Sequence, residues 1–225
     1  MRPLRTPLIG LALAFVLGAC AAEPTPTPAP ACPDAAPTST AAQATLEGAE
    51  LATVRIGGAV EGEFGFELYG EDAPIATASF VALARCGFYD GIKFHRVLAG
   101  FVIQAGDPET ENNDGDFPTI GQGGPGYEFE IEPPADGLDY APYSVSMAND
   151  TLTNGSQFFI ALADLNEGLP RNYTIFGQVV TGTEAIDAIA VVPVTDPRIG
   201  VPATPVVIES ITISGAAGPS ASPGE

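Results

Sequence analysis

The chain has 225 residues, 45% of them hydrophobic, which suits a single domain with a sizeable core and terminal tails. Its 28 acidic residues greatly outnumber its 8 basic ones, and the net charge is −20. A surface this acidic repels the phosphate backbone of nucleic acids, so we expect no nucleic-acid partner.

The first nineteen residues are typical of a secretory signal peptide. Arg2 and Arg5 precede an apolar run, Leu8–Leu17, that is too short to span a bilayer as a lone helix. The run leads into Leu17-Gly18-Ala19-Cys20, which resembles a bacterial lipobox, and that resemblance implies that Cys20 is lipidated and becomes the new N-terminus. The alternative is an ordinary signal peptide with an incidental cysteine. We expect residues 1–19 to be removed and the protein to be lipid-anchored outside the cytoplasm, at an inner or outer membrane that the sequence does not distinguish.

Residues 20–50 are rich in alanine, proline and threonine. This composition cannot bury a core, and it predicts a disordered linker about 90 Å long at most between the anchor and the domain. Residues 215–225 are predicted to form a second disordered tail. Cys32 lies in the linker and Cys86 at the end of a predicted helix, and the sequence leaves open whether they form a disulfide.

Residues 51–214 carry the pattern of one mainly β domain. The alternation of Phe64, Phe66 and Leu68 with polar residues predicts a half-buried strand. Helices are predicted over Ile75–Cys86, which Gly87 ends, and Thr183–Ile189. Further strands are predicted over Ala52–Ile56, Ile92–Leu98, Phe101–Ala105, Ser144–Met147, Gln157–Leu162, Ile175–Val180 and Val206–Ile213. Many short strands with two helices indicate a barrel or a sandwich.

One segment, Phe94–Gln104, is the most informative part of the chain. It reads Phe-His-Arg-Val-Leu-Ala-Gly-Phe-Val-Ile-Gln, and the motifs Ser146–Asn149 and Asn154–Phe159 follow about fifty residues later. Together these motifs resemble the cyclophilin family of peptidyl-prolyl cis/trans isomerases, over roughly Ala52–Ile213. The resemblance implies an eight-stranded antiparallel closed β-barrel with an α-helix over each open end. It also implies an enzyme that needs no cofactor and acts, as a monomer, on proline-containing segments of folding proteins.

Prolyl isomerisation sets requirements that Arg96 can meet. The barrier is about 18–20 kcal/mol because the C–N bond has double-bond character. Rotation makes the prolyl nitrogen pyramidal, so a fixed donor near it stabilises the twisted amide. The resemblance assigns this role to Arg96, in place of an ordinary ion-paired strand arginine.

The resemblance also implies the remaining site residues. Phe101 and Gln104 join Arg96 as catalytic residues, with Gln104 orienting the peptide. The predicted substrate-binding residues, which include the apolar proline pocket and a segment whose backbone bonds the peptide, are Val102, Ala148, Asn149, Phe159, Leu169 and Tyr173. Val102 and Gln104 share a strand parity, so both can face one groove.

The single histidine, His95, invites a catalytic interpretation. The reaction transfers no net proton, so we expect His95 to be a hydrogen-bonded structural residue. One histidine without a thiol partner also argues against a transition-metal site, and we predict no metal.

Two positions depart from the family pattern. Tyr173 stands where many members have histidine, and Gly168 where some have a tryptophan whose indole N–H donates to cyclosporin. We therefore predict weak cyclosporin binding with isomerase activity retained. The alternative function is a non-catalytic module that binds proline segments, and Arg96, Phe101, Gln104 and Phe159 favour the enzyme. The client proteins and the catalytic efficiency cannot be read from the sequence.

Overall fold

The computed structural model describes residues 29–112, 121–149 and 152–215. The predicted signal peptide, Cys20 and almost all of the predicted C-terminal tail lie outside these residues. The helices are α1 (Ser39–Leu46), α2 (Pro74–Arg85) and α3 (Thr183–Ala190), with a 3₁₀ turn η1 (Pro108–Thr110). The strands are β1 (Leu51–Gly58), β2 (Gly62–Leu68), β3 (Arg96–Leu98), β4 (Val102–Ala105), β5 (Phe129–Glu130), β6 (Ser144–Asn149), β7 (Thr153–Ala161), β8 (Ile175–Thr181) and β9 (Val206–Ser214).

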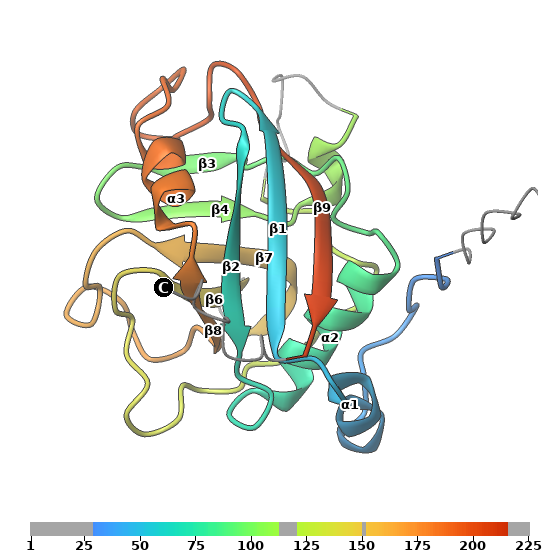
Figure 1. The fold of residues 1–225 in the computed structure, drawn as a ribbon. Coiled ribbons are helices and arrows are strands. Elements are labelled where there is room, and N and C mark those ends of the chain that lie inside the picture. Colours follow the sequence, from blue (N-terminus) through green and yellow to red (C-terminus); the bar gives the residue numbers. More distant parts are fainter. Residues whose placement is uncertain (1–28, 113–120, 150–151, 216–225) are drawn as a thin grey trace, which may run out of the picture.

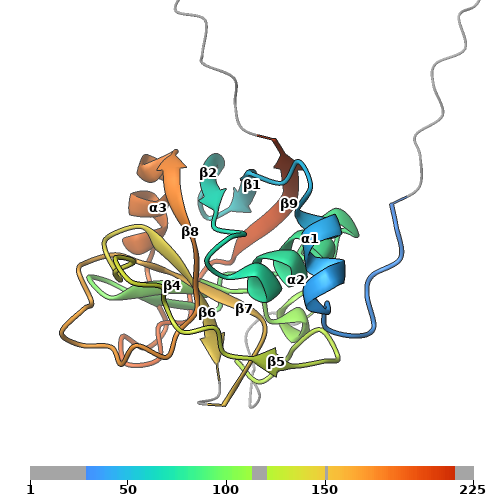
Figure 2. The same cartoon turned by 90° about the horizontal axis from the view of Figure 1, so that it is seen from below.

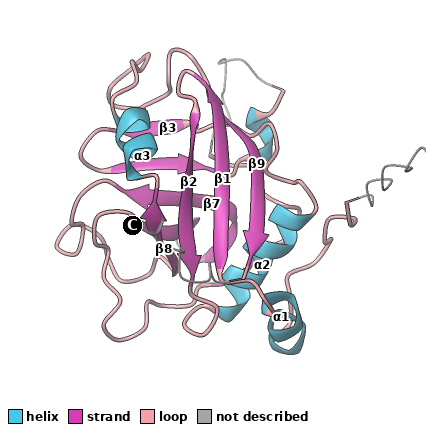
Figure 3. Cartoon of the chain, viewed as in Figure 1, coloured by secondary structure: helices cyan, strands magenta, loops and turns pink. Residues whose placement is uncertain are grey.

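The strands form one antiparallel sheet that curls on itself. Its order is β3-β4-β7-β6-β8-β2-β1-β9, and the short β5 pairs with β7 off this path. In Figure 1, β1, β2 and β9 cross in front of β3, β4 and β7, so the two halves of the sheet enclose a common interior. The mainly β class is therefore confirmed. Figure 3 places α3 on one side of the sheet and α1 with α2 on the opposite side.

The closed barrel is not confirmed. Among the described residues the two edge strands, β3 and β9, form no ladder with each other. The chain before β3 meets β9 instead, through the bridge Lys93↔Val207 and through main-chain hydrogen bonds that include Phe94 N–H to the Val206 carbonyl at 2.9 Å and Ile208 N–H to the Ile92 carbonyl at 2.8 Å. The predicted strand Ile92–Leu98 is accordingly interrupted, and only its last three residues, Arg96–Leu98, form a regular strand.

α2 closes the interior of the sheet. Pro74 provides a favourable first helical residue and Gly87, with a φ of 78°, ends the helix as predicted. Phe80 points inward and its ring lies 5.2–5.7 Å from the rings of four aromatic neighbours, Phe66, Tyr89, Phe158 and Phe176. This aromatic cluster forms the centre of the main core and fixes the helix on the sheet.

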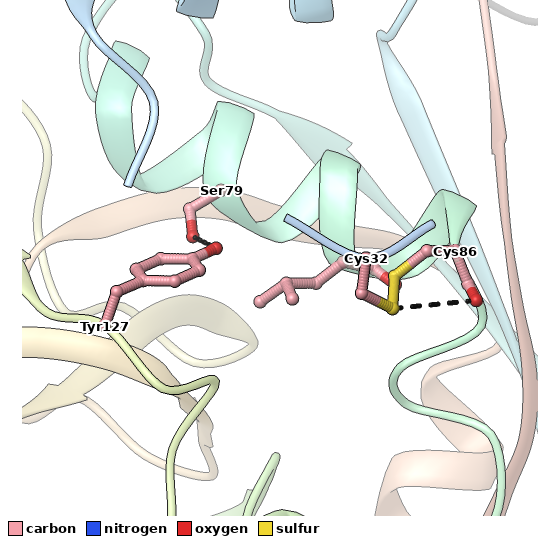
Figure 4. The surroundings of a disulfide bond; sticks show 5 residues. Cys32, Ser79, Cys86 and Tyr127 are labelled. Carbon is pink, nitrogen blue, oxygen red and sulfur yellow. Dashed lines mark hydrogen bonds between the residues drawn. A yellow bond between two sulfur atoms is a disulfide. The ribbon is translucent and has the colours of Figure 1, made fainter. Parts of the chain in front are cut away.

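The segment before the domain is not structureless. Thr38 caps α1 by accepting a hydrogen bond from the Ala41 N–H at 3.3 Å, and α1 packs beside α2 (Figure 2). A disulfide joins Cys32 to Cys86 at the end of α2 (Figure 4). The expectation of a disordered linker reaching residue 50 is therefore wrong for Ser39–Leu46. Weak local helix signals could not reveal a helix that depends on packing against α2.

None of the described helices is both long and apolar enough to cross a bilayer.

Candidate active site

Arg96 lies on a short hairpin that brings it beside Gln104. The two are register partners of β3 and β4, and opposed residues project from the same face of a sheet. Arg96 Nη1 donates a hydrogen bond of 3.3 Å to Gln104 Oε1. The Phe101 ring, just after the turn at Gly100, has its centroid 5.7 Å from Arg96 Cζ. The hairpin thus places the three predicted catalytic residues side by side.

The guanidinium of Arg96 has no carboxylate partner among the described residues. Other arginines do pair with acids: Arg55 with Glu209, Arg171 with Asp139 and Arg198 with Asp196. Burial lowers the pKa of Arg96 from its ordinary value, while the charge of Tyr173 acts in the opposite direction. Arginine stays protonated under such a shift. Arg96 therefore presents a partly desolvated positive charge that no acid in the described part of the chain neutralises.

An apolar cluster separate from the main core lies next to this charge, and we call it the pocket cluster because it contains the predicted proline-pocket residues. Gln104 pairs with Phe159 across β4 and β7, and Val102 pairs with Ala161 two residues further along. The pocket cluster consists of buried Val102, Tyr140, Phe159, Ala161, Leu165 and Ile175, with half-buried Phe101, Ala148, Leu169 and Tyr173 packed against them. The Tyr173 ring meets the Phe159 ring edge-on at 5.6 Å. Every predicted apolar site residue is thus brought into one cluster.

The end of β6 forms one border of the site. Ala148 has no register partner in the β6–β7 ladder, because the register shifts between Met147 and Asn149. The Asn149 side chain donates to the Asn172 carbonyl at 2.8 Å. Ala148 and Asn149 also line a groove of about 810 Å³, together with Gln104. These three residues therefore connect the pocket region to a larger surface groove.

The side chains of Gln157 and Asp107 hold the groove wall, and the sequence did not reveal their importance. Gln104 Nε2 donates to Gln157 Oε1 at 3.0 Å, and Gln157 Nε2 donates to the Gly123 carbonyl at 2.8 Å. The buried Asp107 carboxylate accepts the Gly121 N–H at 2.7 Å. A Cβ at Gly123 would collide with Asp107 Oδ1, so this close approach requires glycine.

The sequence relatives agree with this geometry. Residues 51–213 match the family described as "Cyclophilin type peptidyl-prolyl cis-trans isomerase/CLD". The chain belongs to the cyclophilin family. Peptidyl-prolyl cis-trans isomerase A of Mycobacterium tuberculosis is 38% identical over 169 residues, which cover 68% of this chain and 87% of the relative. A relative from Helicobacter pylori is 39% identical over 132 residues, which cover 57% of this chain and 75% of the relative.

Solved structures agree as well. This cyclophilin superposes on a cyclophilin type peptidyl-prolyl cis-trans isomerase of Cryptosporidium parvum with a TM-score of 0.64 at 29% identity, covering 75% of this chain and 99% of that one. A second structure of the parasite protein, determined in the presence of the dipeptide Ala-Pro, gives 0.63 at 30% identity, covering 74% of this chain and 100% of that one. The predicted enzyme class, peptidyl-prolyl isomerase, is confirmed by this family membership.

His95 differs from the expectation for this cyclophilin. Its imidazole is buried, and neither ring nitrogen has a hydrogen-bond partner among the described residues, so the prediction of a hydrogen-bonded histidine is wrong there. Burial lowers its pKa to about 4, while the nearby Asp107 raises it and Arg96 lowers it further. The Lys93 main chain also raises this pKa. His95 is therefore neutral at pH 7 and lies beside the site as an uncharged ring.

Within residues 29–112, 121–149 and 152–215, no three His, Cys, Asp or Glu side chains group so that they could hold a metal ion. The absence of a metal stays a prediction for the whole chain.

Proposed function

We propose that this cyclophilin isomerises Xaa–Pro bonds by stabilising the twisted amide with Arg96. The observation that carries the proposal is the guanidinium of Arg96, which among the described residues bonds only the neutral Gln104 amide, at 3.3 Å, and adjoins the apolar pocket cluster. The prolyl nitrogen gains a lone pair only as the C–N bond twists. A donor directed at that nitrogen therefore lowers the barrier rather than binding both states equally.

The apolar cluster would grip the proline ring while the twisting takes place. Val102 and Phe159 are buried, and Leu169 and Tyr173 are half-buried at the cluster's edge, so a pyrrolidine ring there loses contact with water. Gln104 would orient the peptide, and the main chain at Ala148, which has no partner in the β6–β7 ladder, would bond it like an added strand. The solved relative crystallised with Ala-Pro supports a proline-containing ligand.

We further propose that the enzyme works outside the cytoplasm, lipid-anchored through Cys20, on secreted or envelope proteins as they fold. The disulfide between Cys32 and Cys86 supports an oxidising compartment, since cytoplasmic thiols are kept reduced. Uncatalysed exchange takes tens to hundreds of seconds, slow enough to limit folding. Mass analysis of the mature N-terminus tests the anchor. A diacylated Cys20 is expected, and an N-terminus elsewhere with an unmodified cysteine would contradict it.

The catalytic proposal is tested by a protease-coupled assay on a proline tetrapeptide. Arg96→Ala should lower kcat/KM at least about tenfold, because it removes a transition-state donor. Arg55→Ala is the matched control, since Arg55 lies on β1 in an exposed pair with Glu209. Equal rates for Arg96→Ala and wild type would reject the mechanism. Peptide binding without isomerisation by the wild type would instead favour a non-catalytic binding module.

A further inference from the structure

The hydroxyl of Tyr140 bonds the main chain of the pocket residue Tyr173. Tyr140 lies before β6 with its side chain in the pocket cluster. Its Oη lies 3.0 Å from the Tyr173 carbonyl and 3.2 Å from the Pro170 carbonyl, and it accepts the Tyr173 N–H at 3.1 Å. A phenol has one proton and two lone pairs, so the two carbonyls share that proton while the oxygen accepts the amide.

The loop that receives these bonds has no ladder of its own. Residues 162–174 connect β7 to β8 without regular secondary structure, so their polar main-chain groups need other partners. Tyr140 meets this loop at its other end too. Its N–H donates to Asn166 Oδ1 at 2.9 Å, and its carbonyl accepts the Leu165 N–H at 2.9 Å. Tyr140 thus bonds the loop on both sides of Leu169.

The position of the Tyr173 ring depends on the main chain that Tyr140 holds. The ring packs edge-on against Phe159 at 5.6 Å and against Tyr140 itself at 6.5 Å. β6 holds the residues on either side of Tyr173, through the Asn149 side chain at the Asn172 carbonyl and the Met147 N–H at the Thr174 carbonyl, both at 2.8 Å. The Tyr140 hydroxyl holds the N–H and the carbonyl of Tyr173 itself, and a bulky ring on an irregular segment can adopt several orientations unless its main chain is fixed.

We propose that Tyr140 is a positioning residue of the proline pocket, whose hydroxyl holds the main chain at Tyr173 so that the Tyr173 ring packs against Phe159 beside Arg96. The inference rests on the proposed function, since it assigns Tyr140 a part in forming the same pocket. Tyr140 acts through Tyr173 and touches no reacting atom.

The test compares two tyrosine-to-phenylalanine variants three residues apart. Tyr140→Phe removes only the hydroxyl, and we expect kcat/KM to fall about five- to tenfold, mainly through a higher KM, because a pocket wall contacts the proline before and during twisting. Tyr143→Phe is the matched control. Its hydroxyl donates to Asp187 at 3.0 Å, on the exposed side by α3, and its loss should leave both constants unchanged. Wild-type KM in Tyr140→Phe would overturn the proposal.

A double-mutant cycle separates positioning from general stability. In a Tyr173→Ala background the ring that Tyr140 positions is gone, so Tyr140→Phe should change KM less than twofold. The same five- to tenfold loss in both backgrounds would show that Tyr140 acts on the fold as a whole and would overturn the proposal.

Amide hydrogen exchange of the wild type supplies a readout that needs neither a variant nor activity. The Tyr173 N–H should exchange at least about a hundredfold more slowly than an unprotected amide, because it donates to the phenol oxygen. Exchange as fast as in an unprotected loop would overturn the proposal. An inactive wild type with a protected Tyr173 amide would reject the proposed function while leaving the role of Tyr140 supported.

Discussion

Arg96 and Gln104 face each other across the β3–β4 hairpin and share a hydrogen bond of 3.3 Å from Nη1 to Oε1. The acceptor is a neutral amide, so the arginine keeps its full charge. The other end of the same amide donates to Gln157 at 3.0 Å, and this bond fixes which way the amide faces. In a protein with 28 acidic residues, the neutrality of this partner is what leaves Arg96 available.

Gln104→Glu should impair catalysis, although the new side chain has nearly the same shape as glutamine. The new carboxylate would pair with the guanidinium of Arg96, and we expect kcat/KM to fall at least about tenfold because the twisted amide must then compete for the donor. The protease-coupled assay measures this. Gln178→Glu adds the same charge on β8, away from the pocket, and should have wild-type kinetics. Unchanged kinetics in Gln104→Glu would show that Arg96 need not be free of acids.

His95 should make the fold sensitive to mild acid. Its pKa is about 4 in the folded protein against an ordinary value of 6.5. Below 6.5 the unfolded chain therefore binds a proton that the folded protein does not. The stability that His95 contributes is complete above pH 6.5 and is lost as the pH falls to about 4. The total loss amounts to about 3 kcal/mol, since each pKa unit corresponds to about 1.4 kcal/mol.

Urea unfolding between pH 4 and pH 7 measures this loss. Many carboxylates titrate in the same range, so the relevant quantity is the difference between wild type and His95→Gln. The variant should show a slope of unfolding free energy against pH that is shallower by up to about 1.4 kcal/mol per unit. Parallel slopes would mean that His95 is solvated in the folded protein.

Removing the disulfide should loosen the N-terminal segment without affecting catalysis. Cys32 and Cys86 are 54 residues apart, and a crosslink of that length stabilises a fold by about 4 kcal/mol in the loop-entropy estimate. The double variant Cys32→Ser/Cys86→Ser should lose up to that much free energy of unfolding and should become cleavable by proteases around α1. Reduced wild type is the control and should behave alike. An unchanged unfolding midpoint in both would contradict a stabilising role.

Gly168→Trp should increase cyclosporin affinity. Gly168 is exposed, its backbone is not left-handed, and a Cβ there would meet only the Leu165 carbonyl, at 3.8 Å. A tryptophan can therefore be accommodated next to Leu169 and can offer the indole N–H that this chain lacks. We expect cyclosporin to inhibit the wild type weakly and the variant at least about tenfold more strongly, because the indole N–H adds a hydrogen bond to the bound drug. Tight inhibition of the wild type would contradict the prediction.

Much of the fold could be predicted because it follows local patterns. The alternation of Phe64 and Phe66 with polar neighbours determines a strand with one buried face, and both side chains are fully buried in the sheet. The two predicted helices were confirmed within one residue at each end, because Pro74 and Gly87 mark the limits of α2 and the apolar spacing marks α3. Arg96, Gln104 and Phe159 meet because they lie on neighbouring strands with matching parity.

The motifs along the chain already indicate which chemistry is available: an arginine beside an apolar strand pair, one histidine, and no acid–base or nucleophile set. How those groups are used depends on the way the chain packs in three dimensions. The disulfide, the docking of α1 on α2 and the three contacts of the Tyr140 hydroxyl all join segments far apart in the chain, and the burial of His95 likewise depends on such packing. Such contacts depend on the path of loops and the packing of whole elements, which local composition and periodicity do not encode.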